Sequence, residues 1–391
     1  MSQPKTQTAV VCSRAEESAE AARGLGKELR TQFGNIPPDV VILFSASRHN
    51  AAALLRGLEE ACSPKIIVGC SSAGEFTNDM IGEGHVCALG IRSSDLTFAV
   101  GTSRKLAENR EAAAREIVAT FNQPGDPSAY SAALVLTDGL AGHADELIEH
   151  LTFLTGGNHQ FFGGGAGDDG HFKRTEVFLN QEIATGAAVA LEIRSSKPIG
   201  VGVRHGWYPA SKPMRVTEAR GSVLVSLNAM AGLEVVTMHA ENTRQAFDPA
   251  DPMPFFLHNI LGIDMGDGFR LRVPLALQDD GSILCAAEIP EGASVCIMAT
   301  DAASARQAAT AATEAAMSQL KGHPANAALF FDCVATRLRM GHEFGDELAA
   351  VKAVLGPIPL AGCNTYGQVA RSEGQFSGFH NCTAVVCVLP G

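Results

Sequence analysis

The sequence predicts an α/β protein with two domains of repeated strand–helix–strand units, whose mixed sheets are covered by helices. Strand and helix patterns alternate along both halves of the chain, and one glycine-ended pattern recurs three times. The length of 391 residues exceeds one compact core, and 46% hydrophobic residues supply a large interior. We therefore expect an N-terminal domain over residues 1–208 and a C-terminal domain over residues 209–391.

The first unit shows the pattern most completely. Residues 8–13 and 39–44 are apolar runs of strand length, and the residues around Leu25 between them have helical spacing. Residues 54–61 again have helical spacing. Residues 65–69 form the next strand, which ends in a glycine loop. The order strand, helix, strand, helix, strand predicts a layered α/β unit.

The same order recurs twice. Residues 132–137 and 327–333 are apolar strands, and helical patterns follow them at 147–154 and 344–355. Each unit then carries a glycine loop after a strand and ends in a closing strand. The loops read G-C-S-S-A-G-E at 69–75, F-F-G-G-G-A-G-D-D at 161–169 and G-C-N-T-Y-G-Q at 362–368, and the closing strands lie at 85–91, 187–193 and 381–389.

A different region lies between the second and third copies. Residues 214–227 look like two strands joined at Arg220-Gly221, and Asp279 to Gly281 is a strong turn signal. Residues 302–320 are an alanine-rich helix. We place the domain boundary near 205–215 and expect a mixed sheet in the second domain.

Composition excludes several classes of function. A net charge of -12 argues against a nucleic-acid surface. The polar N-terminus is not a signal peptide, and no segment has the roughly 20 apolar residues of a membrane helix, so we expect a cytoplasmic protein without a membrane partner. The ten Cys form no C-x-x-C pair, which favours small buried side chains in a reducing compartment.

The glycine loops are the first candidate ligand site. Backbone N–H groups at Gly164 and Gly165 could approach an anion, while Glu75, Asp168 and Gln368 could orient a polar ligand. Phosphate is not expected, because the loop leads into two carboxylates rather than a helix. The structural alternative is tight chain reversal at positions where only glycine fits.

Two further groups of residues are candidates. Cys70 and Cys363 occupy matching places after a strand and could be nucleophilic thiolates, although burial is the simpler role. His205 stands between Arg204 and Gly206-Trp207 at the expected domain junction. An imidazole beside a cation and an indole suits a planar anionic ligand such as haem, with His205 as the axial metal ligand; packing of the junction is the alternative.

Several motifs together resemble the FIST sensory proteins. They are residues 68–75, 161–168, His205 to Pro209, 359–368 and Phe379 to Thr383, where Asn381 lies before the last strand. The resemblance implies FIST N-terminal and C-terminal domains and an intracellular, non-enzymatic input role in signal transduction. After Pro209 the chain departs from the family pattern, since Ala210-Ser211-Lys212 replaces the usual Ile-Gly pair.

Three functions follow as hypotheses. The chain is similar to stand-alone bacterial nitric oxide sensing proteins, which implies haem, a gas ligand and a partner histidine kinase or related signalling protein. The second hypothesis is a sensor of a small polar molecule such as an amino acid, with Glu75, Asp168, Asp169 and Gln368 on the loops as its contacts. The third is an enzyme that uses Cys70 or Cys363.

Overall fold

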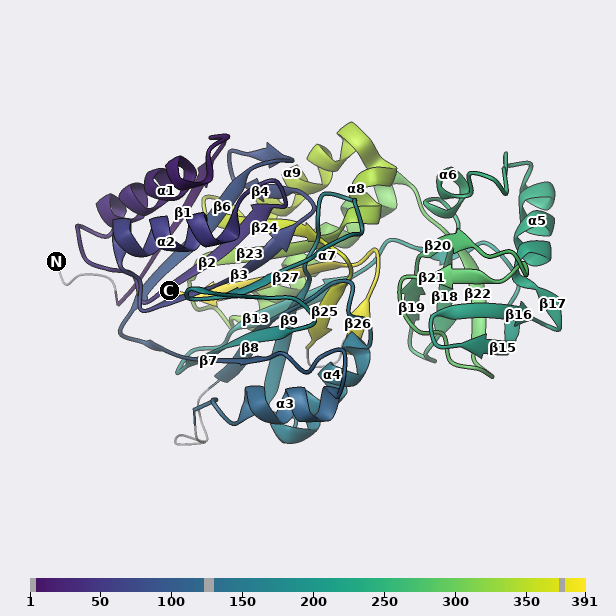
Figure 1. The fold of residues 1–391 in the computed structure, drawn as a ribbon, viewed down its shortest axis with the longest axis horizontal. Helices are drawn as coiled ribbons and strands as arrows, with labels where there is room; N and C mark the ends of the chain where they lie inside the picture. The colour runs from purple at the N-terminus through teal and green to yellow at the C-terminus, as the bar shows by residue number, and fades with distance from the viewer. Residues whose placement is uncertain (1–4, 123–129, 373–376) are drawn as a thin grey trace.

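The three repeated segments fold into three units of the same topology in a computed structural model, which describes residues 5–122, 130–372 and 377–391. Figure 1 shows the units packed together as a core, with a separate domain beside them. The first unit contains β1 (Thr6–Ser13), α1 (Ser18–Gln32), β2 (Val40–Ala46), α2 (Ala51–Cys62), β3 (Ile66–Ser72), β4 (Glu75–Thr77), β5 (Ile81–Gly82) and β6 (Val86–Ser93).

The other two units repeat this order, and the third is interrupted by the separate domain. The second contains β7 (Leu96–Ser103), α3 (Arg110–Val118), β8 (Tyr130–Thr137), α4 (Ala144–Leu154), β9 (His159–Gly165), β10 (Val177–Leu179), β11 (Glu182–Ala184) and β12 (Ala188–Ser195). The third contains β13 (Gly200–Arg204), α7 (Ala302–Gln319), β23 (Ala325–Cys333), α8 (Val334–Met340), η1 (Gly341–Glu343), α9 (Phe344–Leu355), β24 (Leu360–Thr365), β25 (Gln368–Arg371), β26 (Ser377–His380) and β27 (Ala384–Pro390).

Each unit gives its hairpin to the sheet of another unit. The sheet orders are β1-β6-β2-β3-β10-β11, β26-β25-β9-β8-β12-β7 and β13-β27-β23-β24-β4-β5. The pairs β2–β3, β8–β9 and β23–β24 are parallel, whereas the outer strands pair antiparallel. The mixed α/β sheets expected from the sequence are confirmed, and the exchanged hairpins tie the three units into one body.

The main core lies where the three sheets face one another. Phe44, Phe162 and Phe331 come from different sheets and are fully buried, and the Phe331 ring centroid lies 5.6 Å from Phe44 and 6.4 Å from Phe162. Three other apolar clusters fill the spaces between the sheets and their covering helices. Because these strands are buried on both faces, they read as continuous apolar runs in the sequence.

The region between β13 and α7 forms a domain of its own, which we call the inserted domain. Its ladders are all antiparallel. The mixed sheet expected for residues 209–391 is the one that contains β23, β24 and β27. It contains β14 (Tyr208–Pro209), β15 (Met214–Arg220), β16 (Val223–Leu227), β17 (Met230–Ala231), α5 (Gly232–Thr243), α6 (Met253–Phe256), β18 (Ile260–Asp264), β19 (Phe269–Arg272), β20 (Pro274–Leu277), β21 (Ile283–Cys285) and β22 (Ser294–Ala299).

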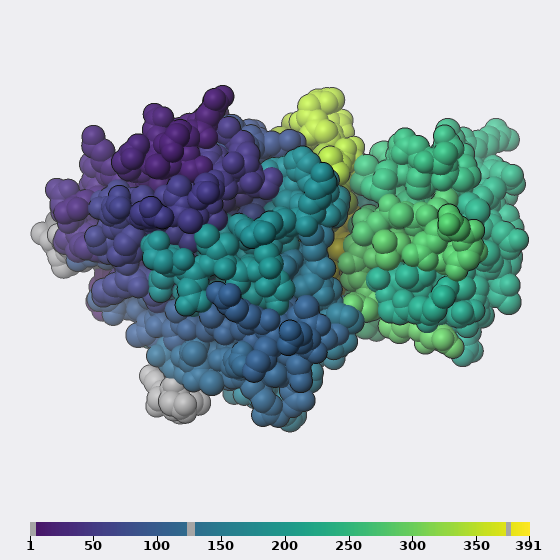
Figure 2. Space-filling model, viewed as in Figure 1, coloured from purple at the N-terminus to yellow at the C-terminus, as the bar shows by residue number. Residues whose placement is uncertain are grey.

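The inserted domain has its own apolar cluster, which includes Val216, Phe256 and Val295. In Figure 2 it is a distinct lobe, set against the core along a groove. The chain leaves the core close to residue 208 and returns at α7, so the C-terminal strands rejoin the core sheets. In the described part of the chain, no helix combines the length and the apolar character that crossing a membrane requires.

Candidate functional site

The three glycine loops lie in contact, and backbone hydrogen bonds connect them. The Gly165 N–H donates to the Gly367 carbonyl at 2.9 Å, and the Gly167 N–H donates to the Ser71 carbonyl at 2.9 Å. The third link runs from the Ala73 N–H to the Asn364 carbonyl, also at 2.9 Å. These loop N–H groups are therefore used within the protein, which favours the structural role of the glycines.

Close approach of the backbones explains why glycine occupies these positions. A Cβ atom at Gly164 would lie 2.7 Å from the Gly367 carbonyl oxygen, and one at Gly165 would lie 2.9 Å from the Tyr366 carbonyl oxygen. A side chain at either position would push the loops apart. Gly164 and Gly165 thus allow close backbone contact between the loops inside the core, and they do not line an open pocket.

Glu75 and Gln368 occupy equivalent positions and brace the closing strands. Glu75 Oε2 accepts from the His85 N–H at 3.0 Å, and Gln368 Oε1 accepts from the Thr383 N–H at 3.2 Å; His85 and Thr383 directly precede β6 and β27. Both side chains are fully buried. Burial raises the pKa of Glu75 to about 8, although hydrogen bonds from Ser72 and His85 oppose the shift.

Asp168 braces the loop that follows β9. Its carboxylate accepts backbone N–H groups from Phe172, Lys173 and Arg174 at 2.7–2.9 Å and the Tyr366 hydroxyl. Burial disfavours the charged form, but the hydrogen bonds from Tyr366 and from the three N–H groups outweigh it and lower the pKa of Asp168. The Asp168 carboxylate is thus already engaged within the protein.

Cys70 and Cys363 lie in the apolar core between the sheets, and neither is exposed to solvent. Burial and the neighbouring Cys70 raise the pKa of Cys363 well above its usual range, which disfavours a thiolate. Cys12 is half-buried and the other nine Cys are buried. The geometry therefore favours small buried side chains over nucleophiles at these two positions.

His205 does not fit an iron ligand in this structure. Its Nδ1 accepts the Trp207 backbone N–H at 3.3 Å, so Nε2 carries the proton and faces the Phe269 carbonyl at 3.0 Å. The adjoining cavity, which Arg204 and Trp207 also line, has a volume of only about 10 Å³. Trp207 is buried, and its indole lies 5.6 Å from the Arg339 guanidinium. These residues pack the junction between core and inserted domain.

A larger cavity of about 450 Å³ opens between the core and the inserted domain, and we call it the interdomain pocket. Its walls are mainly apolar and come from both sides. Leu140, Val334 and Tyr366 belong to the core, and Leu275 and Ala286 to the inserted domain. A mostly apolar concave site with a few polar groups at a domain junction is the typical setting of a small-molecule site.

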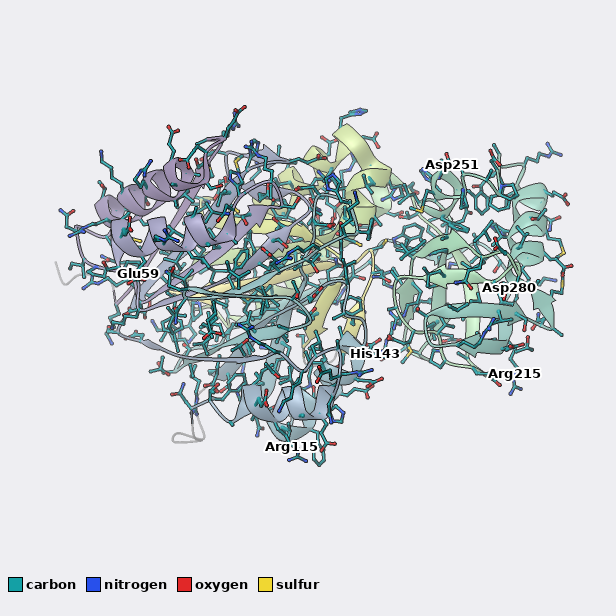
Figure 3. The ribbon with its side chains drawn as sticks, viewed as in Figure 1. Glu59, Arg115, His143, Arg215, Asp251 and Asp280 are labelled. Carbon is teal, nitrogen blue, oxygen red and sulfur yellow. The ribbon has the colours of Figure 1, made fainter. Side chains whose placement is uncertain are left out.

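Polar groups lie at the floor and rim of the interdomain pocket. Asn381, which the sequence singled out, lines the floor and is 1% exposed. At the rim, Glu288 of the inserted domain accepts the His143 N–H at 3.1 Å. His143 is labelled in Figure 3 at the edge of the core that faces the inserted domain. Among the described residues, no group of three His, Cys, Asp or Glu is arranged to hold a metal ion.

The expected site residues are thus not gathered in one cavity. Asn381 lines the interdomain pocket, whereas Glu75 and Asp168 line two other cavities. Sequence analysis missed Tyr366 and Ala286, which line the interdomain pocket from opposite sides. Tyr366 lies inside the third glycine loop, so its place in that loop could have identified it as a candidate pocket residue. No sequence pattern around Ala286 identifies it as one.

Two family models match this chain. The FIST N domain matches residues 39–230, and the FIST C domain matches residues 246–371. The uncharacterized protein MT0656 of Mycobacterium tuberculosis is 25% identical over 382 residues, which cover 95% of each chain. The uncharacterized protein Mb0898c of Mycobacterium bovis is 23% identical over 389 residues, which cover 97% of each chain.

Among solved structures, a cyanuric acid hydrolase from A. caulinodans aligns over 98% of this chain and 99% of its own, with 8% identity and a TM-score of 0.37. A likeness at that level says nothing about activity. The two domain models together span most of the chain, in the order expected from the motifs. The chain belongs to the FIST family, with a FIST N domain followed by a FIST C domain, and this membership implies a sensory role in signal transduction.

Proposed function

We propose that this FIST protein senses a small amphipathic molecule that binds in the interdomain pocket, and that it does so without catalysing a reaction. The observation that carries the proposal is the pocket itself: about 450 Å³, mainly apolar, and walled by both the core and the inserted domain. A ligand that contacts both walls binds one relative pose better than others. Its differential affinity is the free energy available for signalling.

A change in the pose of the inserted domain is the proposed output. The partner that reads it is a histidine kinase or a related signalling protein, as the family resemblance implies. The inserted domain has its own core, and a change of its pose would rearrange its buried contacts with the main core, the Arg272–Asp145 ion pair among them. The protein is proposed to act in the cytoplasm.

The finer hypothesis, a haem-bound nitric oxide sensor, finds no support at His205, because its ring nitrogens are engaged and the cavity beside it is small. Absorbance spectra of the protein purified from haem-replete cells test it. A Soret band that His205→Ala abolishes would restore haem as the ligand. We expect no such band.

The amino-acid hypothesis is also less favoured. Glu75, Asp168 and Gln368 brace backbone N–H groups inside the core, and they do not converge on one cavity. A zwitterion would moreover meet few charged partners in the mainly apolar interdomain pocket.

A thermal-shift screen of amphipathic metabolites tests the proposal. A ligand at 100 times its Kd stabilises the folded state by about 2.7 kcal/mol. We expect Ala286→Phe, which fills the pocket from the inserted domain, to abolish the shift. Ala303→Phe serves as the matched control, because Ala303 lies in α7, after the chain has returned to the core. Small-angle scattering should then show a ligand-dependent change of shape. A hit that Ala286→Phe leaves unchanged would place the ligand elsewhere and refute the assignment.

A further inference from the structure

A second cavity, distinct from the interdomain pocket, contains a buried amide that makes no hydrogen bond to any residue that the structure describes. This cavity of about 470 Å³ lies between helix α8, the β4–β5 hairpin and strand β24. Asn364 on β24 lines it and is 1% exposed, yet neither its Oδ1 nor its Nδ2 makes a hydrogen bond within the described part of the chain. A buried primary amide with both groups unsatisfied costs stability unless something binds it.

The position of Asn364 is fixed by the loops around it. Its backbone N–H donates to the Gly74 carbonyl at 2.8 Å, and its own carbonyl accepts the Ala73 N–H at 2.9 Å. These two hydrogen bonds fix the backbone of Asn364, so its amide can change direction only by rotation about its own side-chain torsions. The side chain thus presents a donor and an acceptor at the cavity wall.

Arg337 supplies a cation beside this amide. Its Nη1 is paired with Glu83 on the hairpin, while its Nε is buried and without a partner among the described residues. A Cβ atom at Gly74 would lie 2.8 Å from Asn364 Oδ1 and 3.2 Å from Arg337 Nη1. The absence of a side chain at Gly74 thus leaves room between the amide and the guanidinium.

The charges of the cavity select the kind of ligand. Guanidinium and amide N–H groups together recognise a carboxylate, and the amide oxygen then accepts one further hydrogen bond. Among the lining residues, Glu83 is already paired with Arg337, and burial raises the pKa of Glu75 to about 8, so Glu75 is mostly neutral at pH 7. An ammonium group would find no free carboxylate, whereas a hydroxyl group suits the neutral amide oxygen.

We propose that this cavity binds a small α-hydroxy carboxylate, whose carboxylate meets Arg337 and the Asn364 amide nitrogen and whose hydroxyl donates to Asn364 Oδ1. The site is independent of the interdomain pocket. The binding residues come from different units, because the β4–β5 hairpin and Gly74 belong to the first unit and Arg337 and Asn364 to the third.

Isothermal titration of the full chain with L-lactate and glycolate tests this proposal. We expect both to bind, acetate and methyl lactate to bind at least tenfold more weakly because each lacks one of the two recognised groups, and L-alanine to bind more weakly than L-lactate. Asn364→Leu and Arg337→Met should each weaken lactate binding at least tenfold. Arg306→Met, a matched change at a more exposed arginine, and Ala286→Phe in the interdomain pocket should leave it unchanged.

Thermal unfolding separates recognition from a structural role. Because the Asn364 amide has no hydrogen-bond partner within the described ranges, ligand-free Asn364→Leu should unfold at a temperature no lower than the unmodified chain. The proposal is overturned if neither hydroxy acid binds, if acetate binds as tightly as lactate, if L-alanine binds more tightly than lactate, or if Asn364→Leu and Arg337→Met leave lactate binding unchanged.

Discussion

Arg272 of the inserted domain is ion-paired with Asp145 at the start of α4 in the core, with 2.5 Å between Nη2 and Oδ2. Arg272 is 1% exposed, and it also donates to the Glu288 and Phe379 carbonyls at 2.8 and 3.1 Å. Asp145 in turn accepts the Phe379 N–H at 2.6 Å. This buried network holds the inserted domain against the core beside the interdomain pocket.

Removing one partner of this ion pair should destabilise the protein strongly. Arg272→Met leaves Asp145 without its main cation, and we expect the free energy of unfolding to fall by about 3–5 kcal/mol. Urea denaturation followed by circular dichroism measures it. Arg220→Met is the matched control, because its ion pair with Asp280 is exposed, and it should cost about 0.5 kcal/mol or less. Similar losses in both variants would show that the buried pair has no special role.

Glu75 should make stability depend on pH. Its pKa is about 8 in the folded protein, against an ordinary value of 4.5, so the folded state binds more protons between these values and stability falls as the pH rises through them. Glu75→Gln copies the side chain at the equivalent Gln368. We expect the pH slope of the unfolding free energy between pH 5 and 8 to become shallower.

Exposed Glu60 on helix α2 provides the control for this experiment. Glu60→Gln should leave the slope as it is in the unmodified chain. A Glu75→Gln variant with an unchanged slope would mean that Glu75 is charged in the folded protein at neutral pH.

Two glycine-to-alanine changes should have opposite effects. Gly163 has a φ of +135°, and a Cβ there would lie 2.1 Å from the Val135 carbonyl oxygen, so Gly163→Ala should lower stability by more than about 1 kcal/mol. Gly24 lies on the exposed face of helix α1 with nothing within 4 Å of its Cβ position. Gly24→Ala should raise stability by about 1 kcal/mol, as measured by chemical denaturation. Equal effects would contradict the close contact at Gly163.

Cys333 should be the first buried thiol to react. It lines the interdomain pocket, and a hydrogen bond from the Cys382 side chain, aided by backbone N–H groups, lowers the pKa of Cys333 to about 6 despite burial. Iodoacetamide at pH 7 with mass spectrometry should label Cys333 before Cys387, which lies unexposed in the core. Ligand in the interdomain pocket should slow this labelling. Equal rates at both thiols would refute the prediction.

The repeated units could be predicted from the sequence because each strand and helix has a pattern of apolar residues within a short stretch of the chain. Apolar runs such as residues 39–44 are buried on both faces, and the spacing around Leu25 is that of a helix with one buried face, so residues near one another in the chain carry the pattern. The glycine loops could also be predicted from short stretches of sequence, because the close approach of the backbones excludes side chains at Gly164 and its equivalents.

The tertiary structure alone decided which hairpin joins which sheet, where the inserted domain returns to the core, and which side chains face the cavities. Asn364 had no local mark as a binding residue, because its unsatisfied amide matters only beside Arg337 and Gly74, which lie far away along the chain. The pattern of buried and exposed positions in a helix or strand can be predicted from residues close together in the sequence. A binding site, in contrast, depends on contacts between segments that are distant in the sequence. Those contacts exist only once the three units have exchanged their hairpins.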